Sequence, residues 1–155
     1  MANTTTAVVV ERRIAAPAER VWRALTDVAG APDVLSGVES VQLLTDQPFG
    51  VGTRWRETRR MFGKAATEEM YVTASEPPRR YVVEADSRGA HYISEFTLDS
   101  GEPDRTLVRM AFTAAPSGGG PGLLAKLFGG LGARAVAKAI ERDLADVAAA
   151  VESGG

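Results

Sequence analysis

Hydrophobic residues along this chain follow two periods. At about residues 7–14, and through most of the chain from 38 to 114, apolar and polar positions alternate, which is typical of strands with one buried face. Short segments rich in Gly, Pro, Asp and Ser separate the alternating runs. The pattern therefore predicts seven strands, at about 7–14, 38–45, 53–61, 66–74, 79–86, 91–98 and 105–114.

Two helical segments are predicted between the first two strands. The first covers about 17–28, where Pro17 suits the first helical turn because its missing N–H would have no partner there. Its apolar face carries residues at helical spacing, namely Val21, Trp22 and Leu25. Gly30 and Pro32 end this helix, and a short helical turn is expected near 33–36.

A long helix is predicted at the end of the chain, over about 121–152. Its apolar stripe steps by three or four residues through Val136, Ile140, Leu144, Val147 and Val151. Charged residues lie off that stripe, namely Lys138, Glu141, Arg142, Asp143 and Asp146. Because glycine disfavours a helix by about 1 kcal/mol relative to alanine, the glycines at 129, 130 and 132 predict a bend near 129–132.

The order of these elements predicts the α+β class. Six successive strands with short connections must pair antiparallel, because a parallel crossover needs about a dozen residues or more. Strands segregated from helices distinguish α+β from α/β proteins. We expect a curved seven-stranded antiparallel sheet around the long C-terminal helix, with two short helices between the first two strands. One helix does not fill the concave face of so wide a sheet, so a cavity is expected between them.

The alternation also predicts which strand residues face the helix, since successive side chains point to opposite faces. Arginines occupy three of the even positions from 54 to 60, so Trp55, Glu57 and Arg59 are assigned to the inner face. The same reasoning assigns to it Glu68, Met70, Val72, Tyr81, Val83, Ala85, Tyr92, Ser94, Phe96, Val108, Met110 and Phe112. His91 has outward parity and is predicted to lie on the surface.

The turns predict how these inward residues pair across strands. A four-residue turn over 62–65 places Arg59 opposite Glu68, and a similar turn over 87–90 places Ala85 opposite Tyr92. The inner face then has three rows: Trp55, Val72, Tyr81, Phe96 and Val108; Glu57, Met70, Val83, Ser94 and Met110; and Arg59, Glu68, Ala85, Tyr92 and Phe112.

Composition narrows the available chemistry. The chain has 155 residues, a formal net charge of −2, one His and no Cys. This length predicts a single domain, 1–155, with an ordered core over 6–152. The lack of Cys excludes disulfides, a thiolate nucleophile and Cys-ligated metals, and one His excludes a multi-histidine site, so no metal and no cofactor are expected. The nearly balanced charge argues against a nucleic-acid partner.

Neither a secretory signal nor a membrane span is predicted. The N-terminal sequence has no basic segment followed by a long apolar core, and no stretch reaches about 18 apolar residues. We therefore expect a cytoplasmic protein without stable membrane insertion. The apolar segment 123–128 is interpreted as closing the mouth of the cavity, with contact to a membrane as the alternative.

Several segments resemble one superfamily. The opening motif at 14–27, the Gly-led third strand at 51–56, the turn at 72–80 and the closing helix with Asp143, Leu144 and Glu152 are similar to the SRPBCC (START-like) superfamily, including its polyketide cyclase/dehydrase group. The resemblance spans about 7–152 and implies a helix-grip fold with a hydrophobic ligand cavity. The family's common Trp-Pro pair after the first helix is absent here.

Glu57 is the candidate catalytic residue. Its predicted row otherwise holds Met, Val and Ser, and desolvation raises the pKa of a carboxyl toward values that suit acid–base catalysis. In the alternative interpretation, the side chain turns outward, or Ser94 or Arg59 satisfies it. Arg59 and Glu68 are expected to form either a structural ion pair or a polar anchor for a ligand carboxylate or carbonyl.

The predicted function is binding of a small hydrophobic or amphipathic ligand, lipid-like, polyketide-like or aromatic, in the cavity. The predicted ligand-binding residues are Trp55, Arg59, Glu68, Met70, Tyr81, Tyr92, Ser94, Phe96, Met110 and Phe112. One alternative is a polyketide cyclase/aromatase or dehydratase that uses Glu57 as acid or base, with Arg59 and Tyr92 polarising a carbonyl. Another is a protein-interaction module. A monomer or a homodimer is expected.

Overall fold

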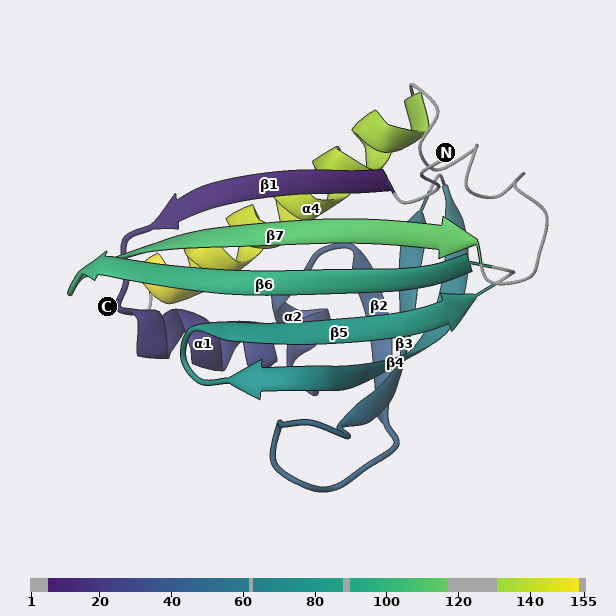
Figure 1. Cartoon of the computed structure of the whole chain (residues 1–155), viewed down its shortest axis with the longest axis horizontal. Coiled ribbons are helices and arrows are strands. Elements are labelled where there is room, and N and C mark those ends of the chain that lie inside the picture. The colour runs from purple at the N-terminus through teal and green to yellow at the C-terminus, as the bar shows by residue number, and fades with distance from the viewer. Residues whose placement is uncertain (1–5, 62, 88–89, 117–130, 154–155) are drawn as a thin grey trace, which may run out of the picture.

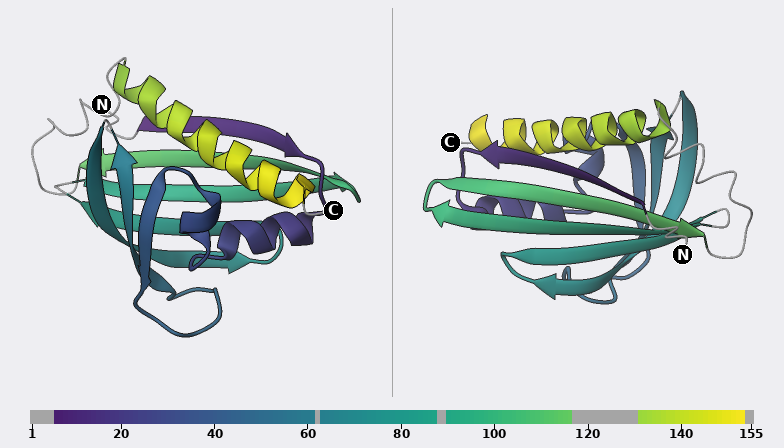
Figure 2. Two further views of the ribbon diagram at one scale, coloured as in Figure 1. Left: turned by 180° about the vertical axis from the view of Figure 1, so that it is seen from behind. Right: turned by 45° about the horizontal axis from the view of Figure 1, so that its top comes forward.

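Seven antiparallel strands form one curved sheet whose concave face is spanned by a long helix (Figures 1 and 2). The computed structural model describes residues 6–61, 63–87, 90–116 and 131–153. The strands are β1 (Thr6–Ile14), β2 (Val38–Leu43), β3 (Arg54–Met61), β4 (Lys64–Glu76), β5 (Arg80–Ser87), β6 (Ala90–Glu102) and β7 (Arg105–Pro116), in the order β1-β7-β6-β5-β4-β3-β2. The helices are α1 (Ala18–Thr26), α2 (Ala31–Val34) and α4 (Leu131–Ser153). The predicted fold class is confirmed.

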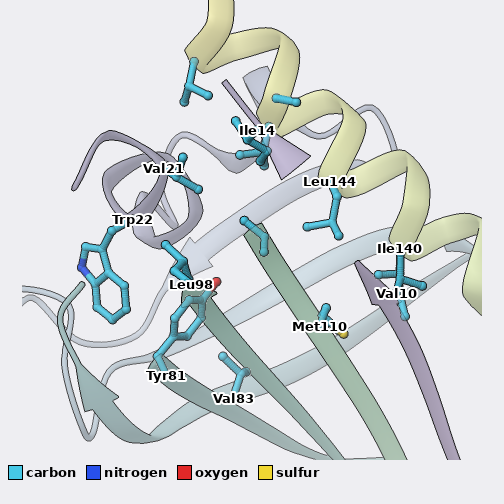
Figure 3. Close-up of a cluster of buried hydrophobic side chains, with 14 of the residues drawn as sticks. Val10, Ile14, Val21, Trp22, Tyr81, Val83, Leu98, Met110, Ile140 and Leu144 are labelled. Carbon is cyan, nitrogen blue, oxygen red and sulfur yellow. The ribbon is translucent and has the colours of Figure 1, made fainter. Parts of the chain in front are cut away.

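Helix α4 has the apolar stripe that the sequence predicts. Its five stripe residues are between 1% and 7% exposed: Val136, Ile140, Leu144, Val147 and Val151. They pack with Ile14 of β1, Val21 of α1 and Val108 of β7 in one hydrophobic core (Figure 3). The predicted start of this helix at 121, its bend near 129–132 and the apolar segment 123–128 lie mostly or wholly outside the described residues.

Polar contacts fix the C-terminal part of α4 against the N-terminal elements. The Glu152 carboxylate accepts a hydrogen bond of 2.8 Å from the backbone N–H of Ala15. The Asp146 carboxylate accepts two hydrogen bonds of 2.9 Å from Ser36, one from its backbone N–H and one from its hydroxyl. These contacts tie the helix to the segments on either side of α1 and α2, and so set its position over the sheet.

The predicted facing of the strand residues is correct, but the predicted register holds in only one of the four ladders between β3 and β7. The β5–β6 pairs agree, including Ala85 opposite Tyr92. Between β3 and β4, however, Arg59 lies opposite Ala66 and Glu57 lies opposite Glu68. The connection there is the two-residue segment 62–63 rather than a four-residue turn, and Gly63 adopts φ +78°, which glycine accepts without strain.

Two further pairings differ from the predicted rows in the same way. Val72 lies opposite Val83 rather than Tyr81, and an irregularity follows it in β4. Ser94 lies opposite Phe112, because β6 extends to Glu102 through a segment that was expected to be a loop. Each slip is two residues long. Since side chains alternate with a period of two, a two-residue slip leaves every side chain on its predicted face.

The convex face of the sheet is polar. Arg54 and Arg56 both contact Glu69 of the neighbouring strand, at 2.8 Å and 3.8 Å. His91 lies on this face, as its parity predicts, and is held between Asp86 and Glu84 with 2.6 Å from a ring nitrogen to each carboxylate. Two hydrogen bonds raise the His91 pKa above its ordinary value, and the bond to Asp86 has a larger effect than the bond to Glu84.

None of the helices within the described ranges is both long and apolar enough to traverse a lipid bilayer.

Truncating the buried stripe of α4 tests the packing of this helix. Leu144 is 1% exposed, so Leu144→Ala is expected to lower the free energy of unfolding by about 2–5 kcal/mol, through lost burial and the cavity left behind. Leu43 on edge strand β2 is 47% exposed, and Leu43→Ala should change it by about 0.5 kcal/mol or less. Urea denaturation followed by circular dichroism measures both. Equal losses would contradict this account of the core.

Candidate functional site

A cavity of about 660 Å³ lies between the concave face of the sheet and the helices. The sheet contributes residues of β3 to β7, and α4 contributes one long side. Helices α1 and α2 and the segment between them contribute Ala24, Leu25, Val28 and Val34. Phe49, from the loop between β2 and β3, completes the lining near α1. The volume falls within the range of about 300–1,000 Å³ that is usual for small-molecule sites.

All eleven residues that the sequence assigns to a site line this cavity: Trp55, Glu57, Arg59, Glu68, Met70, Tyr81, Tyr92, Ser94, Phe96, Met110 and Phe112. They come from five adjacent strands, and alternation alone puts them on one face. Their location is therefore as predicted. Their roles in binding or catalysis stay predictions.

One charged cluster projects into this otherwise mostly apolar cavity. The Arg59 Nε–H donates a hydrogen bond of 3.1 Å to Oε2 of Glu57 on the same strand. Its two terminal nitrogens contact the carboxylate of Asp143 on α4, at 3.1 Å and 3.0 Å, in the fork geometry that is strong for this pair. The indole N–H of Trp55 points to Glu57 at 3.4 Å. We call Glu57, Arg59 and Asp143 the charged triad.

Burial and charge act against each other in the triad. Burial raises the Asp143 pKa, and this effect outweighs the opposing attraction of Arg59; repulsion from Glu57 and Asp146 adds to the rise. Burial alone would lower the pKa of Arg59, but Asp143 and Glu57 more than offset it, so that pKa is raised. Arg59 therefore remains charged, and Asp143 takes up a proton more readily than an exposed aspartate.

The triad differs from the expected ion pair between Arg59 and Glu68. Glu68 is half-buried and lines the cavity, and its carboxylate makes no hydrogen bond or ion pair with any residue that the structure describes. The register explains the difference, because the short 62–63 connection moves Glu68 opposite Glu57 and leaves Arg59 opposite Ala66. Glu57 itself is 8% exposed, which agrees with its inward assignment. Arg59 donates a hydrogen bond to its carboxylate, as the alternative interpretation expected.

Asp143 is the site residue that the sequence interpretation missed. It was assigned to the charged surface of the last helix, yet it contacts Arg59 across the cavity. Its spacing from the stripe residues is the feature of the sequence that could have identified it. Asp143 follows Ile140 by three residues and precedes Val147 by four, so it lies on the same helical face as the apolar stripe. A carboxylate at such a position is unusual enough to mark a candidate functional residue.

Aromatic rings form much of the remaining wall. Tyr81 stacks on Phe96 with ring centroids 4.5 Å apart, and Tyr92 stacks on Phe112 at 5.6 Å. Trp22 and Phe49 meet the Tyr81 ring edge-on. Burial, with a smaller effect of the Asp143 charge, raises the Tyr81 pKa well above its ordinary value, so its hydroxyl stays protonated. The wall thus offers flat apolar faces and a phenolic donor.

Among the described residues, no group of three or more His, Asp or Glu side chains is arranged to hold a metal ion.

The fold and this cavity can now be compared with known proteins. The family model for polyketide cyclase / dehydrase and lipid transport matches residues 5–152. The chain belongs to this family. The match covers nearly the whole chain and confirms the superfamily that the sequence motifs suggested. No curated protein matches the sequence.

Solved structures share the fold at low sequence identity. The Zhui aromatase/cyclase from Streptomyces sp. R1128 is 20% identical, with a TM-score of 0.78 over 96% of this chain and 94% of its own. A START superfamily protein from Mycobacterium smegmatis is 14% identical, with a TM-score of 0.77 over 96% and 99%. Norcoclaurine synthase from Thalictrum flavum, in complex with dopamine and hydroxybenzaldehyde, is 14% identical, with a TM-score of 0.74 over 97% and 88%. These neighbours show the fold, and the family description supports a role in ligand binding or cyclisation.

The raised Asp143 pKa can be measured directly. In carbon-13 NMR, the Asp143 carboxyl should titrate above 3.8, its ordinary value, because of its burial. The folded chain then binds more protons than the unfolded chain between the two pKa values. The stability contributed by this group is therefore fully present below the unfolded pKa and is lost as the pH rises through the folded pKa.

Asp143→Asn serves as the control, because it should remove this loss from the pH profile of the free energy of unfolding. A carboxyl midpoint at or below 3.8 would contradict the electrostatic description of the triad.

Proposed function

We propose that this protein binds a small amphipathic molecule in the cavity. The observation that carries the proposal is the combination of a volume of about 660 Å³, walls of apolar and aromatic side chains, and one charged triad projecting from the wall. An apolar body gains by leaving water, at roughly 25 cal/mol per Å² of buried surface, and the charged residues orient the polar end. A cavity that the protein's own side chains do not fill supports this function over a protein-interaction module, which needs no such space.

Filling the cavity tests the proposal. Ala139 on α4 lines the cavity, whereas Ala150 on the same helix is exposed. Ala139→Phe places a ring where the ligand should lie, so the molecule that co-purifies with the wild-type chain in native mass spectrometry should be lost or reduced at least about tenfold. Ala150→Phe, the matched control, should retain it.

Thermal denaturation of both variants separates loss of binding from loss of folding. Equal ligand occupancy in a folded Ala139→Phe chain would exclude the cavity as the binding site.

A second candidate function is ring closure of a polyketide. It is favoured by the presence of two carboxylates and one guanidinium within the same cavity. In this reaction, Glu57 or Asp143 removes a proton from a carbon beside a carbonyl, and the resulting enolate attacks a second carbonyl to form a carbon–carbon bond. Arg59 and Tyr92 polarise the carbonyls. The new alkoxide takes the proton back and becomes a hydroxyl. In the dehydration that follows, the carboxylate removes a second proton from the adjacent carbon and delivers it to the departing hydroxyl, which leaves as water as the carbon–carbon double bond forms.

Single substitutions of the triad test this reaction with a poly-β-ketone thioester as substrate and mass spectrometry of the cyclised product. Glu57→Gln or Asp143→Asn should lower the rate by about a hundredfold or more if that residue is the acid or base. Glu69→Gln removes a carboxylate from the convex face and should leave the rate unchanged. A wild-type rate in both triad variants would remove their carboxylates from the mechanism.

A further inference from the structure

The charged residues in the cavity are not balanced. Three carboxylates line its interior, on Glu57, Glu68 and Asp143, and among the described residues Arg59 is the only cation of the lining that is not exposed. Two other acidic residues of the lining are engaged elsewhere or exposed: Glu84 bonds His91 and Thr73, and Asp27 lies at an exposed position. Lys64 is likewise exposed. The interior is therefore acidic.

Arg59 is already committed to its two neighbours. Its Nε–H donates to Glu57, and its two terminal nitrogens contact Asp143. The planar fork of the guanidinium is therefore paired with carboxylates of this chain. A ligand carboxylate that accepted hydrogen bonds from the remaining N–H groups of Arg59 would lie close to the carboxylates of Glu57 and Asp143, which repel it. The geometry opposes the anion anchor that Arg59 suggests when it is considered alone.

Glu68 adds to this imbalance from the neighbouring strand. It lies directly opposite Glu57 in the β3–β4 ladder, and like charges at such positions repel each other. It has no cationic or hydrogen-bonding partner within the described part of the chain, so its carboxylate is available to a ligand.

We propose that the cavity selects an amphipathic cation, a molecule with a protonated amine at one end and an apolar, aromatic-sized body. The amine lies near Glu68, Glu57 and Asp143 and supplies the positive charge that the interior lacks. The body lies against Met70, Phe112 and the other rings of the wall, whose faces also attract cations. This inference rests on the proposed ligand-binding function and specifies the charge of its ligand.

Three probes with one body and different heads test the inference: naphthylethylamine, naphthylethanol and naphthylacetate. Isothermal titration calorimetry at pH 7 and low salt gives Kd for each. The amine is expected to bind at least about tenfold more tightly than the acid, with the alcohol between them, because each opposite charge attracts and each like charge repels in a cavity of low polarity. Equal or tighter binding of the acid would overturn the inference.

Two matched variants locate the selectivity. Glu68→Gln should reduce the preference for amine over acid about fivefold while the Kd of naphthylethanol stays the same, because only the charge facing the cavity changes. Glu69→Gln removes the same charge one residue further along β4, but on the convex face beside Arg54, and should leave the preference unchanged. An unchanged preference in Glu68→Gln, or an equal change in Glu69→Gln, would overturn the role of Glu68.

The outcomes also separate this inference from the proposed function. In one outcome, naphthylethanol binds, Ala139→Phe abolishes that binding, and the amine has no advantage over the acid. The cavity is then a binding site, and the proposed preference for a cation is wrong. If none of the three probes binds the wild-type chain, both the selectivity and the proposed binding function are contradicted.

Discussion

Burial of the α4 stripe against the concave face of a single sheet is the constraint on which the rest of this structure depends. Leu144, Val147 and Val151 leave water by packing on β1, β7 and α1, and this fixes one half of the helix. A curved sheet of seven strands is wider than one helix. The helix therefore does not fill the rest of the concave face, and a cavity remains between β3 to β7 and the helix.

The same constraint creates the site. Because α4 spans the concave face of the sheet, Asp143 on the helix reaches Arg59, which lies beside Glu57 on β3. The ion pair costs desolvation, and the raised Asp143 pKa reflects that cost. In return, the cavity has a fixed polar end and an aromatic wall formed by pairs such as Tyr81 and Phe96. The cavity is therefore an oriented surface with one polar end rather than a uniformly apolar space.

The family assignment sets limits on what the site can be expected to do. The structural neighbours include an aromatase/cyclase and norcoclaurine synthase, and both share the fold at 20% identity or less. At such identities a fold hosts different chemistry through different side chains in the same cavity. The charged triad and Glu68 therefore carry more information about this chain's ligand than the fold does.

The sequence by itself determined the succession of strands and helices along the chain, the α+β class and the membership of the inner face, because alternation in strands and the three-to-four spacing in α4 depend only on local geometry. Even the slipped ladders kept every predicted residue in the cavity, since each slip was two residues. Only the tertiary structure decided which charged side chains pair with each other. The short connection at 62–63 separated Arg59 from Glu68, and the approach of α4 gave it Asp143 instead. Such pairing depends on where two distant segments come to lie, which no local pattern encodes.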